Sequence, residues 1–91
     1  MQPLAHAVPG AVVDLLRAAP LSDGKVAFAW KVAVGPAMER ATAVKLDGTV
    51  LVIEASTAQW AREIKRSTGV IISRLGTLLG RDVVTDIKVR S

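Results

Sequence analysis

The amino-acid sequence predicts a single small α+β domain with the element order α-α-β-β-α-β. Residues 22–37 and 56–79 carry apolar side chains at the i, i+3, i+4 and i+7 spacing of helices. Two β-prone segments flank an Asp47-Gly48 dipeptide, and a C-terminal segment alternates apolar and polar residues. Because 91 residues allow one hydrophobic core, we expect one domain over residues 11–91, preceded by a disordered segment at residues 1–10.

The N-terminal part is expected to form two helices. Residues 11–19 have helical apolar spacing and end at a proline. Ser22 or Asp23 can cap the second helix, because a short side-chain oxygen accepts a backbone N–H that the helix leaves unpaired. One apolar stripe follows, made of Val26, Ala29, Trp30, Ala33, Val34 and Ala37. We expect the Gly35-Pro36 pair to break or kink this helix, because proline removes a helical hydrogen bond.

Phe28 and Val32 lie outside this stripe, four residues apart on a neighbouring face of the second helix. The ordinary interpretation is a wide buried face, since Phe and Val are most often interior. The alternative is an exposed apolar contact for a partner protein. Phe28 and Val32 are therefore the candidate partner-binding residues.

Residues 42–55 give the clearest local pattern, that of a β-hairpin. The expected strands, 42–46 and 49–55, are separated by Asp47-Gly48, which suits a two-residue turn whose central positions both need positive φ. Leu51 and Ile53 should face the core, because successive side chains of a strand point to opposite faces. Val50, Val52 and Glu54 should then lie on the other face of the sheet.

The C-terminal part is expected to contain a long helix, from Ser56 or Thr57 to about Leu79, packed on a three-stranded sheet. Its apolar side consists of Trp60, Ile64, Ile71, Ile72, Leu75, Leu78 and Leu79. The stretch 67–69 (Ser-Thr-Gly) is poor helix material and can bend or split the element. Residues 83–90 then alternate as a strand that can join the hairpin as its third member.

The excess positive charge lies entirely in the C-terminal part. Residues 1–55 carry five basic and five acidic side chains, whereas residues 56–91 carry seven basic and three acidic ones, which accounts for the net charge of +4. Such a distribution suits an anion-binding face, and it equally suits a solvated face that keeps a domain soluble. The best candidates for nucleic-acid contacts are Arg62, Lys65, Arg66, Lys88 and Arg90; the first three lie close together at helical spacing.

The two tryptophans offer a second way to contact nucleic acid. Trp30 and Trp60 could stack on single-stranded bases. Both lie on the apolar stripes of their helices, however, and for this reason we expect both to be buried.

The residue types needed for catalysis or metal binding are missing. The chain has no cysteine and one histidine, His6, and it lacks the G-x-x-x-x-G-K-[ST] and G-x-G-x-x-G patterns. Nucleophilic triads and zinc sites need cysteines or several histidines, so we expect no enzyme activity, no metal and no cofactor. The apolar runs are too short to span a membrane, which favours a cytoplasmic protein without a membrane partner.

Four segments of the chain are informative together: Ala29-Trp30-Lys31-Val32-Ala33-Val34-Gly35-Pro36-Ala37, Leu46 to Ile53 around the Asp-Gly pair, Ser56 to Ile64 around Trp60, and Leu75 to Arg90. In order and spacing they resemble the DciA family of bacterial replicative-helicase operators. The resemblance implies a KH-like fold in a protein that engages the replicative DNA helicase, helps its loading and contacts DNA. Many members carry a basic extension beyond this domain, so we expect DNA binding here to be weak and independent of sequence.

Three functions thus stand side by side. The resemblance favours a helicase-recruiting adaptor, and the charge alone favours a general nucleic-acid-binding module. The small residues Gly69, Ser73 and Gly76 on one helix face suggest a structural domain that forms homo-oligomers. The G-x-x-G clamp of RNA-binding KH modules is missing, so a KH-like shape would not imply RNA reading.

Overall fold

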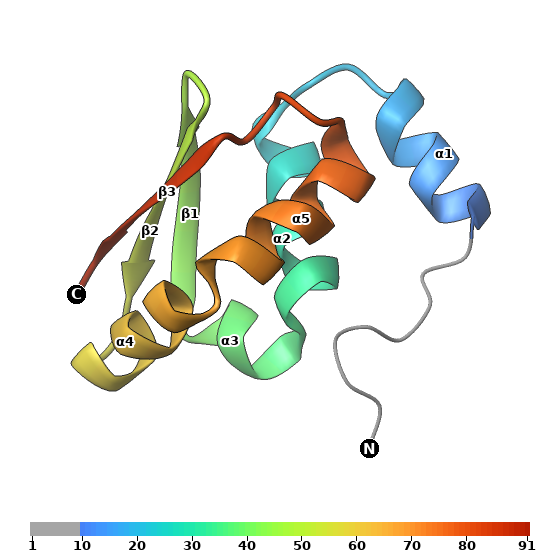
Figure 1. Cartoon of the computed structure of the whole chain (residues 1–91). Helices are drawn as coiled ribbons and strands as arrows, with labels where there is room; N and C mark the ends of the chain where they lie inside the picture. Colours follow the sequence, from blue (N-terminus) through green and yellow to red (C-terminus); the bar gives the residue numbers. More distant parts are fainter. Residues whose placement is uncertain (1–9) are drawn as a thin grey trace.

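The computed structural model describes residues 10–91, which form a layer of helices packed against one face of a three-stranded sheet (Figure 1). The elements are α1 (Gly10–Ala18), α2 (Asp23–Val34), α3 (Pro36–Arg40), β1 (Thr42–Asp47), β2 (Val50–Ala55), α4 (Ala58–Arg66), α5 (Thr68–Leu79) and β3 (Asp86–Arg90). The predicted α+β class is confirmed, and the KH-like assignment stays a prediction. Disorder was expected for residues 1–10, the segment that also contains His6. Residues 1–9 lie outside the part of the chain that the structure describes.

Both ends of α2 follow from local chemistry. The Ser22 hydroxyl accepts a hydrogen bond from the Lys25 backbone N–H at 3.1 Å, as predicted for a cap. At the other end Gly35 has φ +86°, a conformation that favours glycine, and Pro36 opens the next helix. The predicted break at this pair is confirmed, and the five-residue helix α3 follows it.

The expected long helix is two helices, α4 and α5, which meet at Ser67. Ser67 has φ −100° and ψ 10°, outside the helical region, and it ends α4. The Thr68 hydroxyl donates to the Ile64 and Lys65 carbonyls at 3.2 and 3.0 Å. Such side-chain bonds compete with the helical ladder, which explains why a stretch already poor in helix formers splits the element.

The hairpin turn lies one residue later than the sequence indicated. Asp47 pairs with Val50, so the two central residues are Gly48 and Thr49. Only Gly48 has positive φ, +63°, which is the arrangement of a type II′ turn with glycine at its first central position. The prediction of Asp47-Gly48 as the central pair, both with positive φ, is wrong. Neither Asp47 nor the β-branched Thr49 has to adopt a conformation that is costly for it.

The strand order is β1-β2-β3, with β1 antiparallel and β3 parallel to the central β2. Leu51 and Ile53 of β2 are fully buried, as predicted, while Val50 and Val52 on the other face are only partly covered. β3 is shorter than expected and begins at Asp86, after the buried Val84. The parallel pairing arises because α4 and α5 carry the chain back to the end of the sheet where β2 began (Figure 1).

The core between the two layers is apolar, and no polar or charged residue among those described is buried in it. Trp30 is 2% exposed, and its indole N–H donates to the Thr42 hydroxyl at 2.9 Å. Trp60 is only partly buried and packs against the core from its edge. The predicted burial therefore holds for Trp30 and only in part for Trp60. None of the helices within residues 10–91 has the length and apolar character needed to cross a membrane.

Candidate functional site

The five predicted basic residues are all exposed, and we call them the basic surface: Arg62, Lys65, Arg66, Lys88 and Arg90. Helix α4 places the first three. Thr57 caps this helix by accepting the Trp60 backbone N–H at 3.1 Å, and Ala61 and Ile64 bury its inner side in the core. Because 62, 65 and 66 are three and four residues apart, their side chains share the outer side of one turn.

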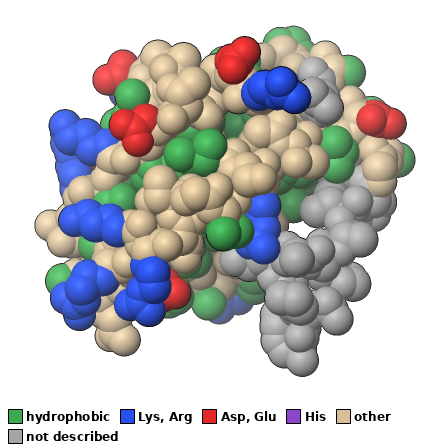
Figure 2. Space-filling view, viewed as in Figure 1, with side chains coloured by type: hydrophobic (Ala, Val, Ile, Leu, Met, Phe, Trp, Pro, Cys, Tyr) green, Lys and Arg blue, Asp and Glu red, His purple; other side chains and the backbone are tan. Residues whose placement is uncertain are grey.

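The parallel pairing of β3 with β2 brings the other two basic residues toward α4. Arg90 pairs with Glu54 near the end of β2, and α4 begins only a few residues later. Lys88 pairs with Val52 on the same, helix-free face of the sheet. Figure 2 shows Lys and Arg side chains gathered at the left and lower left of the view, over α4 and the end of β3. The structure thus brings together two groups that the sequence separates by more than twenty residues.

The basic surface also has acidic neighbours. Glu63 forms an ion pair with Arg66 at 3.6 Å, and both side chains are largely exposed. Glu54 lies beside Arg90 across the strand pair. Exposed ion pairs contribute little to stability. The main effect of these two carboxylates is therefore to lower the positive electrostatic potential of the basic surface. Long, exposed cationic side chains of this kind can contact phosphate groups.

Trp30 cannot serve as a stacking platform, because its ring is buried and its N–H is bonded within the core. The two predicted partner-binding residues differ in their exposure to solvent. Phe28 is 47% exposed, whereas Val32 is half-buried and packs against the core. The interpretation of a wide buried face is therefore wrong for Phe28, since α2 turns Val26 and Trp30 inward instead.

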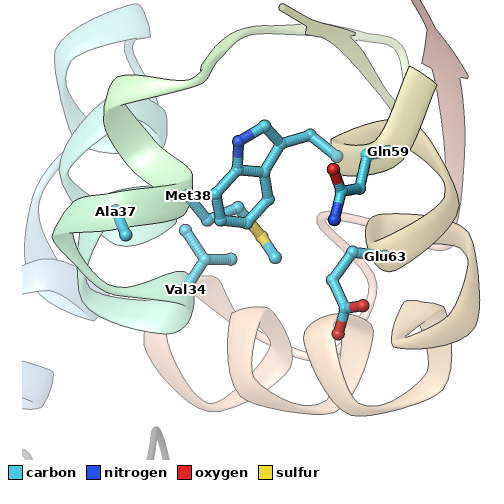
Figure 3. A pocket seen from close by; sticks show the side chains of 6 residues that line it. Val34, Ala37, Met38, Gln59 and Glu63 are labelled. Carbon is cyan, nitrogen blue, oxygen red and sulfur yellow. The ribbon is translucent and has the colours of Figure 1, made fainter. Parts of the chain in front are cut away.

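A groove that the sequence analysis missed lies between α4 and the α2–α3 corner (Figure 3). It has a volume of about 510 Å³ and is lined by Val34, Ala37, Met38, Gln59, Trp60 and Glu63. In Figure 3, Val34, Ala37 and Met38 lie on one side of it and Gln59 and Glu63 on the other. The position of Trp60 in the sequence could have indicated this groove. Trp60 stands between the polar Gln59 and, one turn later, Glu63, so it marks the edge of the apolar stripe rather than its centre.

The model of the protein family described as Dna[CI] antecedent, DciA, matches residues 3–89. The chain belongs to the DciA family. This family consists of non-enzymatic helicase operators, and membership assigns the chain a role in helicase loading during DNA replication. Searches of curated proteins and of solved structures gave no significant match.

The described part of the DciA-family chain offers no metal centre. Within residues 10–91 there is no group of three or more His, Cys, Asp or Glu side chains close enough together to hold an ion. Candidate contact surfaces within the same residues are the basic surface, the exposed Phe28 and the groove beside α4.

Proposed function

We propose that this DciA-family protein is an adaptor that binds the bacterial replicative DNA helicase in the cytoplasm, assists its loading, and contacts DNA weakly through the basic surface. The family match over residues 3–89 is the observation that carries the helicase part. The exposed positions of the five basic side chains support the DNA part. Phe28, with the half-buried Val32 one turn away, is the proposed contact for the helicase, because an exposed large apolar side chain such as Phe28 is typical of protein interfaces.

The expected DNA affinity follows from the number of phosphates that the basic surface can reach. Three to five cations would release a similar number of condensed counterions, which gives a slope of log affinity against log salt of about −2.7 to −4.5. Affinity should then fall by about 40- to 500-fold between 50 and 200 mM salt. We expect these contacts to be made to phosphates, which carry no sequence information, so duplexes of different sequence should bind alike.

A salt titration with fluorescently labelled DNA tests the DNA part. We expect the anisotropy change to vanish as salt rises, with the same midpoint for two unrelated sequences. Affinity that depends on the sequence, or that is insensitive to salt, would contradict contact through phosphates.

A pull-down with the host's purified replicative helicase tests the helicase part and separates the two main candidates. An adaptor retains the helicase without DNA, whereas a general nucleic-acid-binding module, which the same basic surface favours, retains it only through added DNA. Nuclease treatment of both samples is the control. Light scattering on the free chain tests the third candidate, because a homo-oligomer would have a mass of at least twice 9.6 kDa.

A further inference from the structure

Both walls of the groove between α4 and the α2–α3 corner are tied to the core. On the α3 side, the Thr42 hydroxyl donates to the Met38 carbonyl at 2.7 Å and accepts the Trp30 N–H at 2.9 Å, which ties α3 to the core. On the α4 side, the Thr57 cap and the buried Ile64 hold the helix in place. A groove formed before binding loses little conformational entropy when it is filled, which favours affinity.

Trp60 is the feature of the groove that points to a ligand. The two tryptophans differ sharply, since Trp30 is buried with a bonded N–H, whereas Trp60 is half-buried and lines the groove. The Trp60 indole N–H has no hydrogen-bond partner among the described residues, unlike that of Trp30. A partly exposed tryptophan that packs against the core from its edge is typical of the anchor residues of protein interfaces.

The charge of the groove selects the kind of ligand. Of its lining residues within the described part of the chain, Glu63 is the charged one, and it is acidic in a chain of net charge +4. Its ion pair with Arg66 is exposed and 3.6 Å long, so the carboxylate can also accept a ligand cation. A lysine or arginine would be attracted by both the carboxylate and the indole face.

We infer that this groove binds a segment of a partner protein in which an apolar side chain is followed by a lysine or arginine. The apolar side chain packs against Val34, Ala37 and Met38, and the cation reaches Glu63 beside the Trp60 ring. The volume of about 510 Å³ lies within the range of sites that enclose a small ligand or a few side chains. This inference rests on the proposed adaptor function and adds a contact surface to that of Phe28.

The first experiment uses small probes and does not need the helicase. The chain has two tryptophans, so a ¹⁵N-labelled sample gives two indole signals, one of which serves as an internal control. We expect millimolar N-acetyl-Leu-Arg-amide to shift the Trp60 signal and to leave the Trp30 signal in place. N-acetyl-Leu-Glu-amide should shift Trp60 at least threefold less, and Glu63→Gln should remove most of this difference. Equal shifts with both dipeptides, or a shift of Trp30 alone, would overturn the inference.

The same signal tests other occupants of the groove. If the Trp60 signal moves when the free chain is concentrated, the occupant is a second copy and the inference is wrong. If single-stranded DNA moves it in the Glu63→Gln variant and in the wild type alike, the occupant is nucleic acid, which also overturns the inference.

The second experiment measures helicase affinity with matched variants. Ala37→Glu adds a charged side chain inside the groove, and Ala27→Glu adds it to an exposed alanine of α2 outside the groove. We expect the first to lose at least tenfold in affinity and the second to stay within twofold, with both melting like the wild type. If the wild type does not bind the helicase, the proposed function fails, and the dipeptides still test the groove. If the wild type binds and Ala37→Glu binds equally well, the groove is not the helicase contact.

Discussion

Replacing Thr42 by valine is expected to destabilise this DciA-family domain by about 2 kcal/mol, because one hydroxyl group connects the core to α3. That hydroxyl accepts the Trp30 indole N–H at 2.9 Å and donates to the Met38 carbonyl at 2.7 Å. Valine has nearly the shape of threonine, so the packing around the site is retained. The change therefore removes hydrogen bonds and little else.

The magnitude follows from the burial of Trp30. Its side chain is 2% exposed, so water cannot reach the N–H that loses its partner. An unpaired buried donor costs about 1–3 kcal/mol, and the lost bond to the Met38 carbonyl adds up to about 1 kcal/mol. For a domain of this size, about 2 kcal/mol corresponds to a fall in Tm of roughly 8–16 °C.

Thermal melts followed by circular dichroism check this value, with Thr85→Val as the control. The Thr85 hydroxyl bonds to Thr49 at 2.8 Å but is exposed, so this variant should lose at most about 0.5 kcal/mol. In a Trp30→Phe background, Thr42→Val should cost about half as much, because no indole N–H remains to be left unpaired. A Thr42→Val domain that melts within about 2 °C of the wild type, or that loses equally in both backgrounds, would refute this reasoning.

Three further variants address the turn and the two exposed surfaces. Gly48→Val should cost about 1–2 kcal/mol, because a Cβ at φ +63° meets no neighbour and only the backbone conformation is penalised; an unchanged Tm would contradict the turn assignment. Charge reversal of Arg62, Lys65 and Arg66 to glutamate should abolish DNA binding in the anisotropy assay with little change in Tm, since all three are exposed; retained affinity would exclude this face of α4. Phe28→Asp should leave Tm within a few degrees and weaken helicase binding about tenfold or more, and equal retention of the helicase in a pull-down would exclude Phe28 as a contact.

Elements with a local cause were predictable from the sequence. Ser22 caps α2 and Gly35-Pro36 ends it because both effects depend on side chains within one helical turn. The turn of the hairpin was misplaced by one residue for the opposite reason. Asp47 could have been a turn residue or the last strand residue, and its pairing with Val50 on the other strand decides between them.

In the sequence only Trp60 indicates the groove, because the wall formed by α3 is too short to have a pattern. Helix α3 spans five residues, less than two turns, so no apolar period identifies which of its side chains face inward. Trp60 lies on the apolar stripe of α4, and a stripe alone does not show whether another element covers its edge. The break at Gly35-Pro36 was foreseen, but the position of the chain after it depends on the Thr42–Met38 hydrogen bond.

The sequence indicated which residues form the basic surface, but it did not indicate that all five lie close together. The seven basic residues after residue 55 indicated an anion-binding face, but Arg62 and Arg90 come from different elements. They approach each other because β3 runs parallel to β2, which puts the last residues of β3 at the end of the sheet from which α4 departs. An antiparallel third strand would have moved Arg90 to the hairpin end instead.

Helix α4 thus presents two chemistries within nine residues. Ala61 and Ile64 fix the rotation of the helix by their burial, and this rotation exposes Arg62, Lys65 and Arg66 on one face and directs Gln59, Trp60 and Glu63 to the groove. A nucleic acid on the first face and a protein segment in the second would lie about one helix diameter apart, roughly 10–12 Å. The Glu63–Arg66 ion pair joins the two faces, so a cation bound at Glu63 frees Arg66 for a phosphate. If the proposed adaptor holds a helicase and DNA at once, α4 offers a contact for each within one helix.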